Sequence, residues 1–312
     1  MKIYFDFTLE PKKFLNLWLI FYVLVLIPYG WYMYRVRSGT LDMDHPGRIL
    51  FLMLLVMLSA LGIYFYFTRI FVEHLRFGEK RVEFTSTFSS YINRAIPGFL
   101  LSFVSLGIYM AWFIKDLLSF FAGSSHIDGE PLQFHGEARR LFVILLASLF
   151  LPILVLAMIT VQLSPQVLES TWFFIINQAI TMIVLVPYVY FVWVWIMNFQ
   201  HRDQYIYLNT SFSESGLVIL RELGLTIITL GIYFPLMYLR LYVHFAERCV
   251  ITKEGSYRTF GYDLEEGDDF VFIWGQILLC IVTLGIYVPW AFCKVGKRIL
   301  TKTYLTESMP VD

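Results

Sequence analysis

Charge is what this sequence has least of. Only 15% of its 312 residues are Asp, Glu, Lys or Arg, whereas soluble domains carry about 25%. Basic and acidic residues number 24 each, so the formal net charge is zero and the basic surface of a nucleic-acid-binding protein is absent. Apolar residues make up 58% of the chain, more than a soluble core can hide. We therefore expect a membrane protein that has the lipid bilayer as its partner and binds no nucleic acid.

Cysteine and catalytic motifs are also scarce. The three cysteines, Cys249, Cys280 and Cys293, form no C-x-x-C pair and have no histidine at zinc-site spacing. The motifs H-E-x-x-H, G-x-S-x-G, the P-loop and G-x-G-x-x-G are all missing. We therefore expect no enzyme, no metal and no cofactor, and an enzyme acting on lipid is the weakest of the alternatives.

Long apolar runs, in contrast, are plentiful. A bilayer core needs about 20 apolar residues in helical form. Seven runs reach or approach that length, at residues 14–34, 49–72, 95–122, 140–163, 172–199, 217–245 and 270–293. Each must be helical where it meets lipid, because unpaired backbone groups are costly there. The fold class predicted is an all-α, multi-pass membrane protein with about seven hydrophobic segments, in a single domain over residues 1–312.

Several connectors between these runs have the composition of strands. Residues 81–88, 131–136, 204–210 and 256–262 are rich in β-branched and aromatic residues and are bounded by Gly, Asn or Ser. We predict short strands or hairpins that lie against the membrane face. They are too small to form a separate catalytic domain.

One tetrapeptide, Leu-Gly-Ile-Tyr, occurs four times. Its copies are Leu61-Gly62-Ile63-Tyr64, Leu106-Gly107-Ile108-Tyr109, Leu230-Gly231-Ile232-Tyr233 and Leu284-Gly285-Ile286-Tyr287. A small or hydroxylated residue precedes each copy: Ala60, Ser105, Thr229 and Thr283. The spacing predicts an internal duplication, with repeat unit A at about 49–122, repeat unit B at about 217–305, and a spanning hairpin at about 140–199 between them.

The physical properties of the motif suggest a hinge. A glycine lets another backbone approach closely, and the hydroxyl before it can satisfy a freed carbonyl in lipid. Pro235 and Pro289 follow the last two copies and remove a backbone donor there. The predicted hinge or pore-lining residues are Gly62, Gly107, Gly231, Gly285, Tyr64, Tyr109, Tyr233, Tyr287, Pro235, Pro289 and Trp290. The alternative is a helix-packing notch that duplication has repeated.

A few polar residues fall inside the apolar runs, where they are costly. We name Lys115, Asp116, Asn177, Gln178 and Gln276 as the intramembrane polar candidates. They either line a solute path or form interhelical hydrogen bonds. The acidic run at 265–269 does not have the ligand spacing of an EF-hand, and we interpret it as a solvated loop.

The distribution of bases leaves two topologies open. Seven full crossings would divide the 24 Lys and Arg residues equally between the two sides, against the usual cytoplasmic excess. In the rival model, the LGIY segments are re-entrant, only 140–199 spans, and the first segment turns back near residues 28–30. Residues 164–170 carry no base and are then the outside loop. Re-entrant backbone must be buried or line a water-filled cavity, which favours a homo-oligomer or a pore.

The repeat, together with Phe134-His135-Gly136-Glu137, Phe260-Gly261 and the run T-L-G-I-Y-V-P-W at 283–290, resembles the YjgN-like family of bacterial inner-membrane proteins. The resemblance covers most of the chain after about residue 50. Only the fourth copy has the full Pro-Trp ending. The family has no assigned function, so the resemblance implies a multi-pass, inner-membrane location and supplies no chemistry.

These observations favour a protein of the transport class. The leading hypothesis is a channel or solute facilitator built from duplicated, glycine-kinked helices, whose solute the sequence does not identify. The alternative is a non-transporting scaffold or regulatory protein that assembles partners through its cytoplasmic face.

Overall fold

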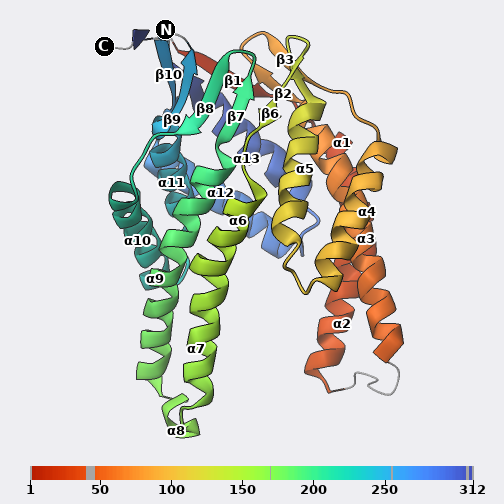
Figure 1. Ribbon diagram of the computed structural model, residues 1–312, viewed down its shortest axis with the longest axis vertical. Helices are drawn as coiled ribbons and strands as arrows, with labels where there is room; N and C mark the ends of the chain where they lie inside the picture. Colours follow the sequence, from red (N-terminus) through yellow and green to blue (C-terminus); the bar gives the residue numbers. More distant parts are fainter. Residues whose placement is uncertain (1, 40–45, 169, 254–255, 307–308, 311–312) are drawn as a thin grey trace.

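Short strands gather at one end of the molecule, and helical hairpins extend away from them (Figure 1). The computed structural model describes residues 2–39, 46–168, 170–253, 256–306 and 309–310. Its strands are β1 (Ile3–Phe7), β2 (Leu75–Phe77), β3 (Lys80–Phe84), β4 (Ser125–Ile127), β5 (Glu130–Pro131), β6 (Gln133–Phe134), β7 (Asn198–His201), β8 (Gln204–Leu208), β9 (Cys249–Lys253), β10 (Ser256–Tyr262), β11 (Thr303–Leu305) and β12 (Met309–Pro310).

The strands form one antiparallel sheet that is nearly closed. Their order is β5-β4-β3-β2-β1-β11-β10-β9-β8-β7-β6, and β12 pairs with β10 beside this path. The two terminal strands of the order, β5 and β6, are consecutive in the chain and are separated only by Leu132. The ends of the sheet therefore meet in one extended segment, and the sheet resembles a barrel without a long free edge.

Two long helical hairpins leave the barrel. The first consists of α1 (Pro11–Phe21), η1 (Tyr22–Leu26) and α2 (Ile27–Arg37), followed by α3 (Pro46–Glu73). The second consists of α6 (Ala138–Leu145), η2 (Leu146–Phe150) and α7 (Leu151–Val161), then α8 (Pro165–Leu168) and α9 (Thr171–Ile196). Within the described residues these give the four helices long and apolar enough to cross a membrane: Pro11–Arg37, Gly47–Glu73, Ala138–Val161 and Thr171–Ile196.

Both long hairpins contain a π-helical turn directly before a proline. The turn η1 ends two residues before Pro28, and η2 ends two residues before Pro152. Proline has no N–H and cannot donate the backbone hydrogen bond of a regular α-helix. The wider π turn before each proline accommodates this missing bond, so the helix continues through the proline. The first segment therefore does not turn back near residues 28–30, as the rival topology required.

Three short helical hairpins complete the fold over the part of the chain that the structure describes. They are α4 (Phe88–Val104) with α5 (Met110–Ser124), α10 (Phe212–Ile228) with α11 (Phe234–Arg248), and α12 (Glu266–Val282) with α13 (Val288–Lys302). In each, a 17-residue helix precedes a 15-residue helix. Seventeen helical residues reach only about 26 Å, less than the roughly 30 Å of a hydrocarbon core. None of these helices is among the four candidate spans of the described residues, and each short hairpin returns to the sheet from which it leaves.

The prediction of an all-α fold with seven segments is therefore wrong. The short strands predicted at 81–88, 131–136, 204–210 and 256–262 overlap β3, β5 and β6, β8 and β10, but their composition gives no sign that they join one nearly closed sheet. The runs 95–122, 217–245 and 270–293 look continuous in sequence because their turns are made of apolar residues. The structure divides each of these runs into two helices.

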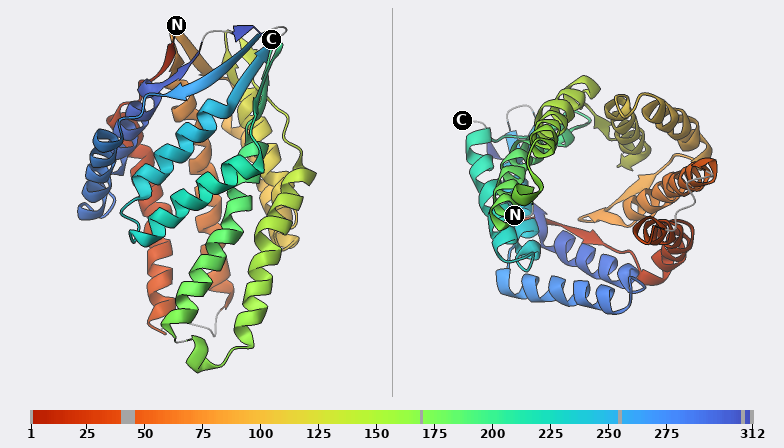
Figure 2. Two further views of the ribbon diagram at one scale, coloured as in Figure 1. Left: turned by 90° about the vertical axis from the view of Figure 1, so that its left-hand side faces the viewer. Right: turned by 90° about the horizontal axis from the view of Figure 1, so that it is seen from below.

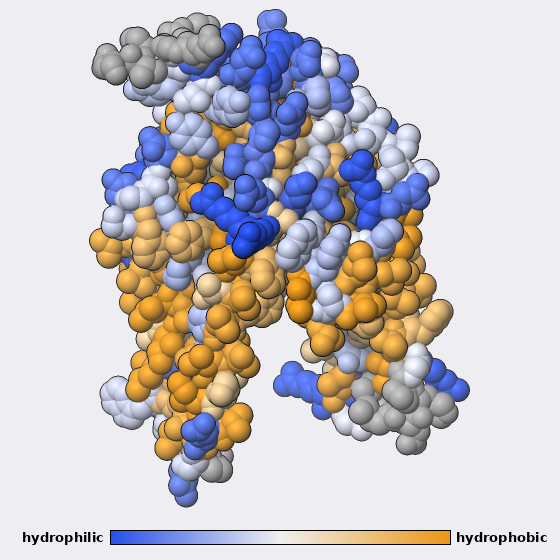
Figure 3. All heavy atoms as spheres, viewed as in Figure 1, coloured by the Kyte–Doolittle hydropathy of each residue, from blue (hydrophilic) through white to orange (hydrophobic). Residues whose placement is uncertain are grey.

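The helices surround a common axis when the molecule is viewed from the end opposite the strands (Figure 2). Buried apolar clusters connect them, and one such cluster, containing Phe7, Phe14 and Cys293, ties β1 and α1 to α13. On the face drawn in Figure 3, hydrophilic residues concentrate around the strands, whereas the hairpins below are covered by hydrophobic residues. This division is what a protein needs when its hairpins lie in lipid and its barrel in water.

Candidate functional site

The LGIY motif forms the turn of all three short hairpins. Its leucine is left-handed in each, with φ of 52° at Leu106, 51° at Leu230 and 50° at Leu284. The following glycine has φ of 87–88°. Its N–H donates to the carbonyl five residues earlier at 2.7 Å in all three turns. This is the hydrogen-bond pattern of a Schellman helix end, so Gly107, Gly231 and Gly285 end one helix and reverse the chain.

The hydroxyl before the motif begins the next helix. Ser105, Thr229 and Thr283 each accept a hydrogen bond from the N–H of the motif tyrosine, at 2.9, 3.0 and 3.1 Å. The tyrosine is the N-cap of the second helix in each case. Pro235 and Pro289 then occupy the first turn of that helix, where no N–H is required. These prolines start a helix and do not kink one.

The first copy of the motif behaves differently. Leu61–Tyr64 lies inside α3, which continues through Gly62. Ala60 has no hydroxyl to cap the N–H of Tyr64, which explains why this copy does not turn. The Leu61 carbonyl nevertheless accepts a hydrogen bond from the Tyr91 hydroxyl of α4 at 3.0 Å. This copy holds two hairpins together.

The tips of the short hairpins are apolar and unusually exposed. Leu106 is 94% exposed, Leu230 93% and Leu284 79%. Such side chains are expected in hydrocarbon, where each backbone carbonyl also needs a donor. Aromatic side chains supply two tips with donors: Trp18 binds the Gly285 carbonyl at 3.0 Å, Tyr22 the Leu284 carbonyl at 3.1 Å, and Trp274 the Ile232 carbonyl at 2.7 Å.

The motif tyrosine also joins the two helices of its hairpin. The Tyr233 hydroxyl donates to Glu222 at 2.7 Å and accepts from Arg240 at 2.6 Å. Glu222 is fully buried, and its carboxylate also forms an ion pair with Arg221 at 2.6 Å. The spacing of 11 residues before and seven after Tyr233 recurs in the next hairpin. There the Tyr287 hydroxyl donates to Gln276 at 3.1 Å and accepts from Lys294 at 2.9 Å.

The structure separates the remaining polar candidates. Lys115 and Asp116 form only a loose ion pair of 3.7 Å on α5. Asn177 and Gln178 lie half-buried on α9. Trp290 stacks on Tyr287 with ring centroids 5.9 Å apart. Of these polar candidates, only Gln276 lines one of the cavities found among the described residues.

Sequence reasoning did not select Glu222 or Arg240 as site residues. The signal that could have identified them is their separation from the LGIY tyrosine along the sequence, which is 11 residues for Glu222 and seven for Arg240. Gln276 and Lys294 have the same separations from Tyr287. The acidic run was also misjudged, since Asp269 is 1% exposed and ion-paired with Arg298 and Lys302 instead of lying in a solvated loop.

The largest of four cavities found among the described residues lies between the last two hairpins. It has a volume of about 970 Å³. We call it the hairpin cavity, and its lining includes Tyr238 of α11, Ile277 of α12 and Val295 of α13. Almost all of its lining groups are aliphatic or aromatic, with Gln276 and the tyrosines supplying the few polar ones.

A smaller cavity adjoins it under the barrel. This barrel cavity, of about 190 Å³, is lined by Phe5, Ile206 and Phe260 from the strands and by residues of α9, α11 and α13. It shares Tyr242 and Leu300 with the hairpin cavity. Together they form an apolar region from the underside of the sheet to the hairpin tips.

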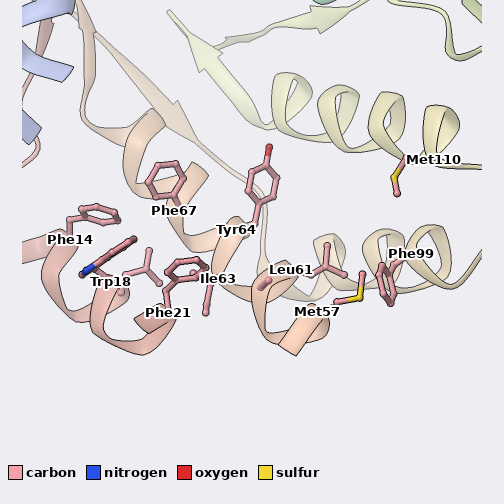
Figure 4. A pocket seen from close by; sticks show the side chains of 12 residues that line it. Phe14, Trp18, Phe21, Met57, Leu61, Ile63, Tyr64, Phe67, Phe99 and Met110 are labelled. Carbon is pink, nitrogen blue, oxygen red and sulfur yellow. The ribbon is translucent and has the colours of Figure 1, made fainter. Parts of the chain in front are cut away.

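A third apolar cavity lies between α1 and α3. Figure 4 shows Phe14 and Trp18 on one wall, with Ile63 and Tyr64 on another. Its volume is about 570 Å³. Drug-sized ligands occupy pockets of about 300–1,000 Å³, so this cavity and the hairpin cavity are large enough for such a ligand. Their lining can hold hydrocarbon but provides no charged group for chemistry.

Comparison with known proteins identifies the family. Four helices long and apolar enough to span a membrane define the chain as a membrane protein. It belongs to the family described as bacterial protein of unknown function (DUF898), which matches residues 2–265. The match includes three copies of LGIY and ends before the fourth. It supports the YjgN-like resemblance only at the level of a bacterial family of unknown function. No curated protein and no solved structure matches the chain.

Proposed function

We propose that this protein is a facilitator that takes an apolar ligand, such as the acyl chain of a lipid, from the bilayer into its central cavities. The observation that carries the proposal is the hairpin cavity of about 970 Å³ with its almost wholly apolar lining. Burying a methylene group in such a cavity contributes about 0.8 kcal/mol. An acyl chain therefore gains several kcal/mol there relative to water, and it exchanges with the equally apolar bilayer at little cost.

The same lining argues against a hydrophilic solute. A channel for ions or small polar molecules needs rings of carbonyls or charged side chains along its path. The hairpin cavity offers Gln276 and tyrosine hydroxyls, and the amide oxygen of Gln276 is engaged by Tyr287 at 3.1 Å. We therefore infer an apolar solute.

Charge supports an orientation for the proposed facilitator. At the tips of the long hairpins, Arg35, Arg37 and Arg48 flank the first loop, and residues 164–170 of the second carry no base. The other 21 of the 24 Lys and Arg residues lie in the barrel and its connectors, in the short hairpins or at the barrel ends of the long helices. Because bases are retained in the cytoplasm, we place the barrel on the cytoplasmic side of the bacterial inner membrane.

Neighbouring residues on α12 provide a matched test. Ile277 lines the hairpin cavity, whereas Leu278 is exposed on the outer side of the same helix. Ile277→Trp should displace about two methylene groups of a bound chain and weaken binding about tenfold. Leu278→Trp should leave binding unchanged. Binding is measured with a fluorescent fatty acid on the purified, detergent-solubilised protein.

Liposomes then distinguish binding from transfer. A facilitator should accelerate the movement of a labelled lipid between leaflets, and Ile277→Trp should reduce that acceleration. Equal binding of the probe to both variants and the wild type would contradict the proposal. A protein that binds no probe but co-purifies with one stoichiometric partner would favour the scaffold alternative instead.

A further inference from the structure

In contrast to the apolar cavities, one further cavity is lined by charged and polar residues. It lies where β1, α1, α3, β2 and β3 meet, has a volume of about 320 Å³, and is lined by Thr8, Glu10, Lys13, Glu73, His74, Arg76 and Arg81. We call it the rim pocket. Nothing in the proposed uptake of an apolar ligand uses it.

Two arginines face each other in the rim pocket. Arg76 on β2 and Arg81 on β3 are directly opposite in the antiparallel register. Side chains at such positions lie about 5 Å apart at Cβ, and like charges there are destabilising. Neither guanidinium forms an ion pair with any residue that the structure describes. The fold therefore places two cations together without providing an anion between them.

The carboxylates near the two arginines do not form ion pairs with them, and they are outnumbered by the bases. Glu73 is held by Arg69 of the same helix at 2.8 Å. Asp6, the cross-strand neighbour of Arg76 on β1, accepts the N–H of Phe7 at 2.8 Å. Glu10 is the remaining carboxylate of the lining.

One further donor, the amine of Lys13, extends the cluster, and Nε2 of His74 accepts from it. The Lys13 amine lies 3.4 Å from Nε2 of His74. The other ring nitrogen of His74 is 2.7 Å from the Ile70 carbonyl, which fixes the ring. The lining thus holds three bases, Lys13, Arg76 and Arg81, against the two carboxylates of Glu10 and Glu73, so its formal charge is +1. Arg69 and Asp6 lie just outside the lining with opposite charges and leave this sum unchanged.

We propose that the rim pocket binds a phosphate-ester group. Guanidinium forks match phosphate oxygens in a bidentate manner, and an ammonium adds a mobile point charge. A bound phosphate would separate Arg76 from Arg81 and remove their repulsion. The group can come from the headgroup of an anionic phospholipid or from a soluble phosphate ester. This site is independent of the apolar cavities and stands without the proposed function.

The test uses the full chain with two probes. Binding of phosphatidylglycerol is measured in nanodiscs against phosphatidylcholine, and binding of glycerol phosphate is measured in detergent. The double variant Arg76→Gln, Arg81→Gln should bind at least about tenfold more weakly, because it loses two charge-assisted contacts. The control Arg258→Gln removes an arginine from β10, outside the rim pocket, and should bind as the wild type does.

The outcomes separate the sources of phosphate. Binding of phosphatidylglycerol alone assigns a lipid headgroup, and binding of glycerol phosphate as well assigns a soluble ester. Equal affinity of the wild type and the double variant, or no binding of either probe, overturns the proposal. If the double variant does not fold, Arg81→Gln, at an exposed residue, carries the same comparison. Ile277→Trp should not change phosphate binding, so the two proposals fail separately.

Discussion

Four donors converge on the buried carboxylate of Asp269. Arg298 and Lys302 bind its Oδ1 at 2.6 and 2.7 Å, while the Tyr262 hydroxyl and the Glu265 N–H reach Oδ2 at 3.3 and 3.2 Å. Burial acts to raise the pKa of this carboxyl, but the hydrogen bonds from Lys302 and Arg298 outweigh burial, and the pKa lies below its ordinary value. The cluster ties the first turn of α12 to the end of α13.

Asp269→Asn should therefore destabilise the protein markedly. Removing one partner from a buried ion pair leaves the others uncompensated and costs about 3 kcal/mol or more. Asp268→Asn, at the exposed neighbouring position, should change stability by less than about 0.5 kcal/mol. Unfolding in detergent, followed by circular dichroism, measures both. Equal losses for the two variants would show that the ion pairs of Asp269 contribute nothing specific.

The same carboxylate predicts the direction of a pH effect. Because the pKa of Asp269 is lower in the folded state than in the unfolded state, its contribution is complete above the unfolded pKa of about 4 and is lost as the pH falls through the folded pKa. The melting temperature of the wild type should therefore fall more steeply below about pH 4 than that of Asp269→Asn. Parallel pH profiles would contradict this.

At the scale of elements, glycines in one motif should respond to substitution with opposite signs. Gly231 has φ of 88°, which an alanine adopts only with strain, so Gly231→Ala should destabilise by about 1–2 kcal/mol. Gly62 lies inside α3 with only a Phe88 ring contact at 3.8 Å, so Gly62→Ala should stabilise by about 0.5–1 kcal/mol. Thermal unfolding of the two variants compares them. Effects of the same sign would contradict the assignment of three turning copies and one continuous copy.

Part of this architecture can be read from the sequence. The residues before LGIY already distinguish the copies, because Ser105, Thr229 and Thr283 can cap the tyrosine N–H and Ala60 cannot. The apolar runs of the long hairpins were located correctly, since about 20 consecutive apolar residues are a strong signal. The left-handed leucines were not foreseeable, because leucine rarely adopts positive φ.

The barrel and the cavities could not be predicted from the sequence. Strand-like composition marked the connectors at 204–210 and 256–262, but composition carries no information about which distant strands pair. The closure of the sheet depends on the short segment from Glu130 to Phe134, which pairs with β4 on one side and β7 on the other. The hairpin cavity likewise depends on how α11, α12 and α13 are spaced.

At the scale of the whole molecule, the barrel gathers the five helical hairpins of the described residues around one axis. Each hairpin connects two neighbouring strands, as α4 and α5 connect β3 to β4. All five therefore start and finish on the strand side. The proposed facilitator depends on this arrangement, because the hairpins surround an apolar space. The short hairpins contribute to that space although they do not cross the membrane. The proposed internal duplication into units A and B remains a prediction.

The most direct test determines on which side of the membrane four turns lie. In a variant lacking Cys249, Cys280 and Cys293, single cysteines at Glu79, Glu130, Asp203 and Gln166 are labelled in intact cells with a membrane-impermeant maleimide. We expect Glu79, Glu130 and Asp203 to be protected together and Gln166 to react, because the first three lie on the barrel side and the last at a hairpin tip. Reaction at Glu130 and Asp203 with protection at Glu79 and Gln166 would instead demonstrate a serpentine chain and contradict the barrel-and-hairpin arrangement.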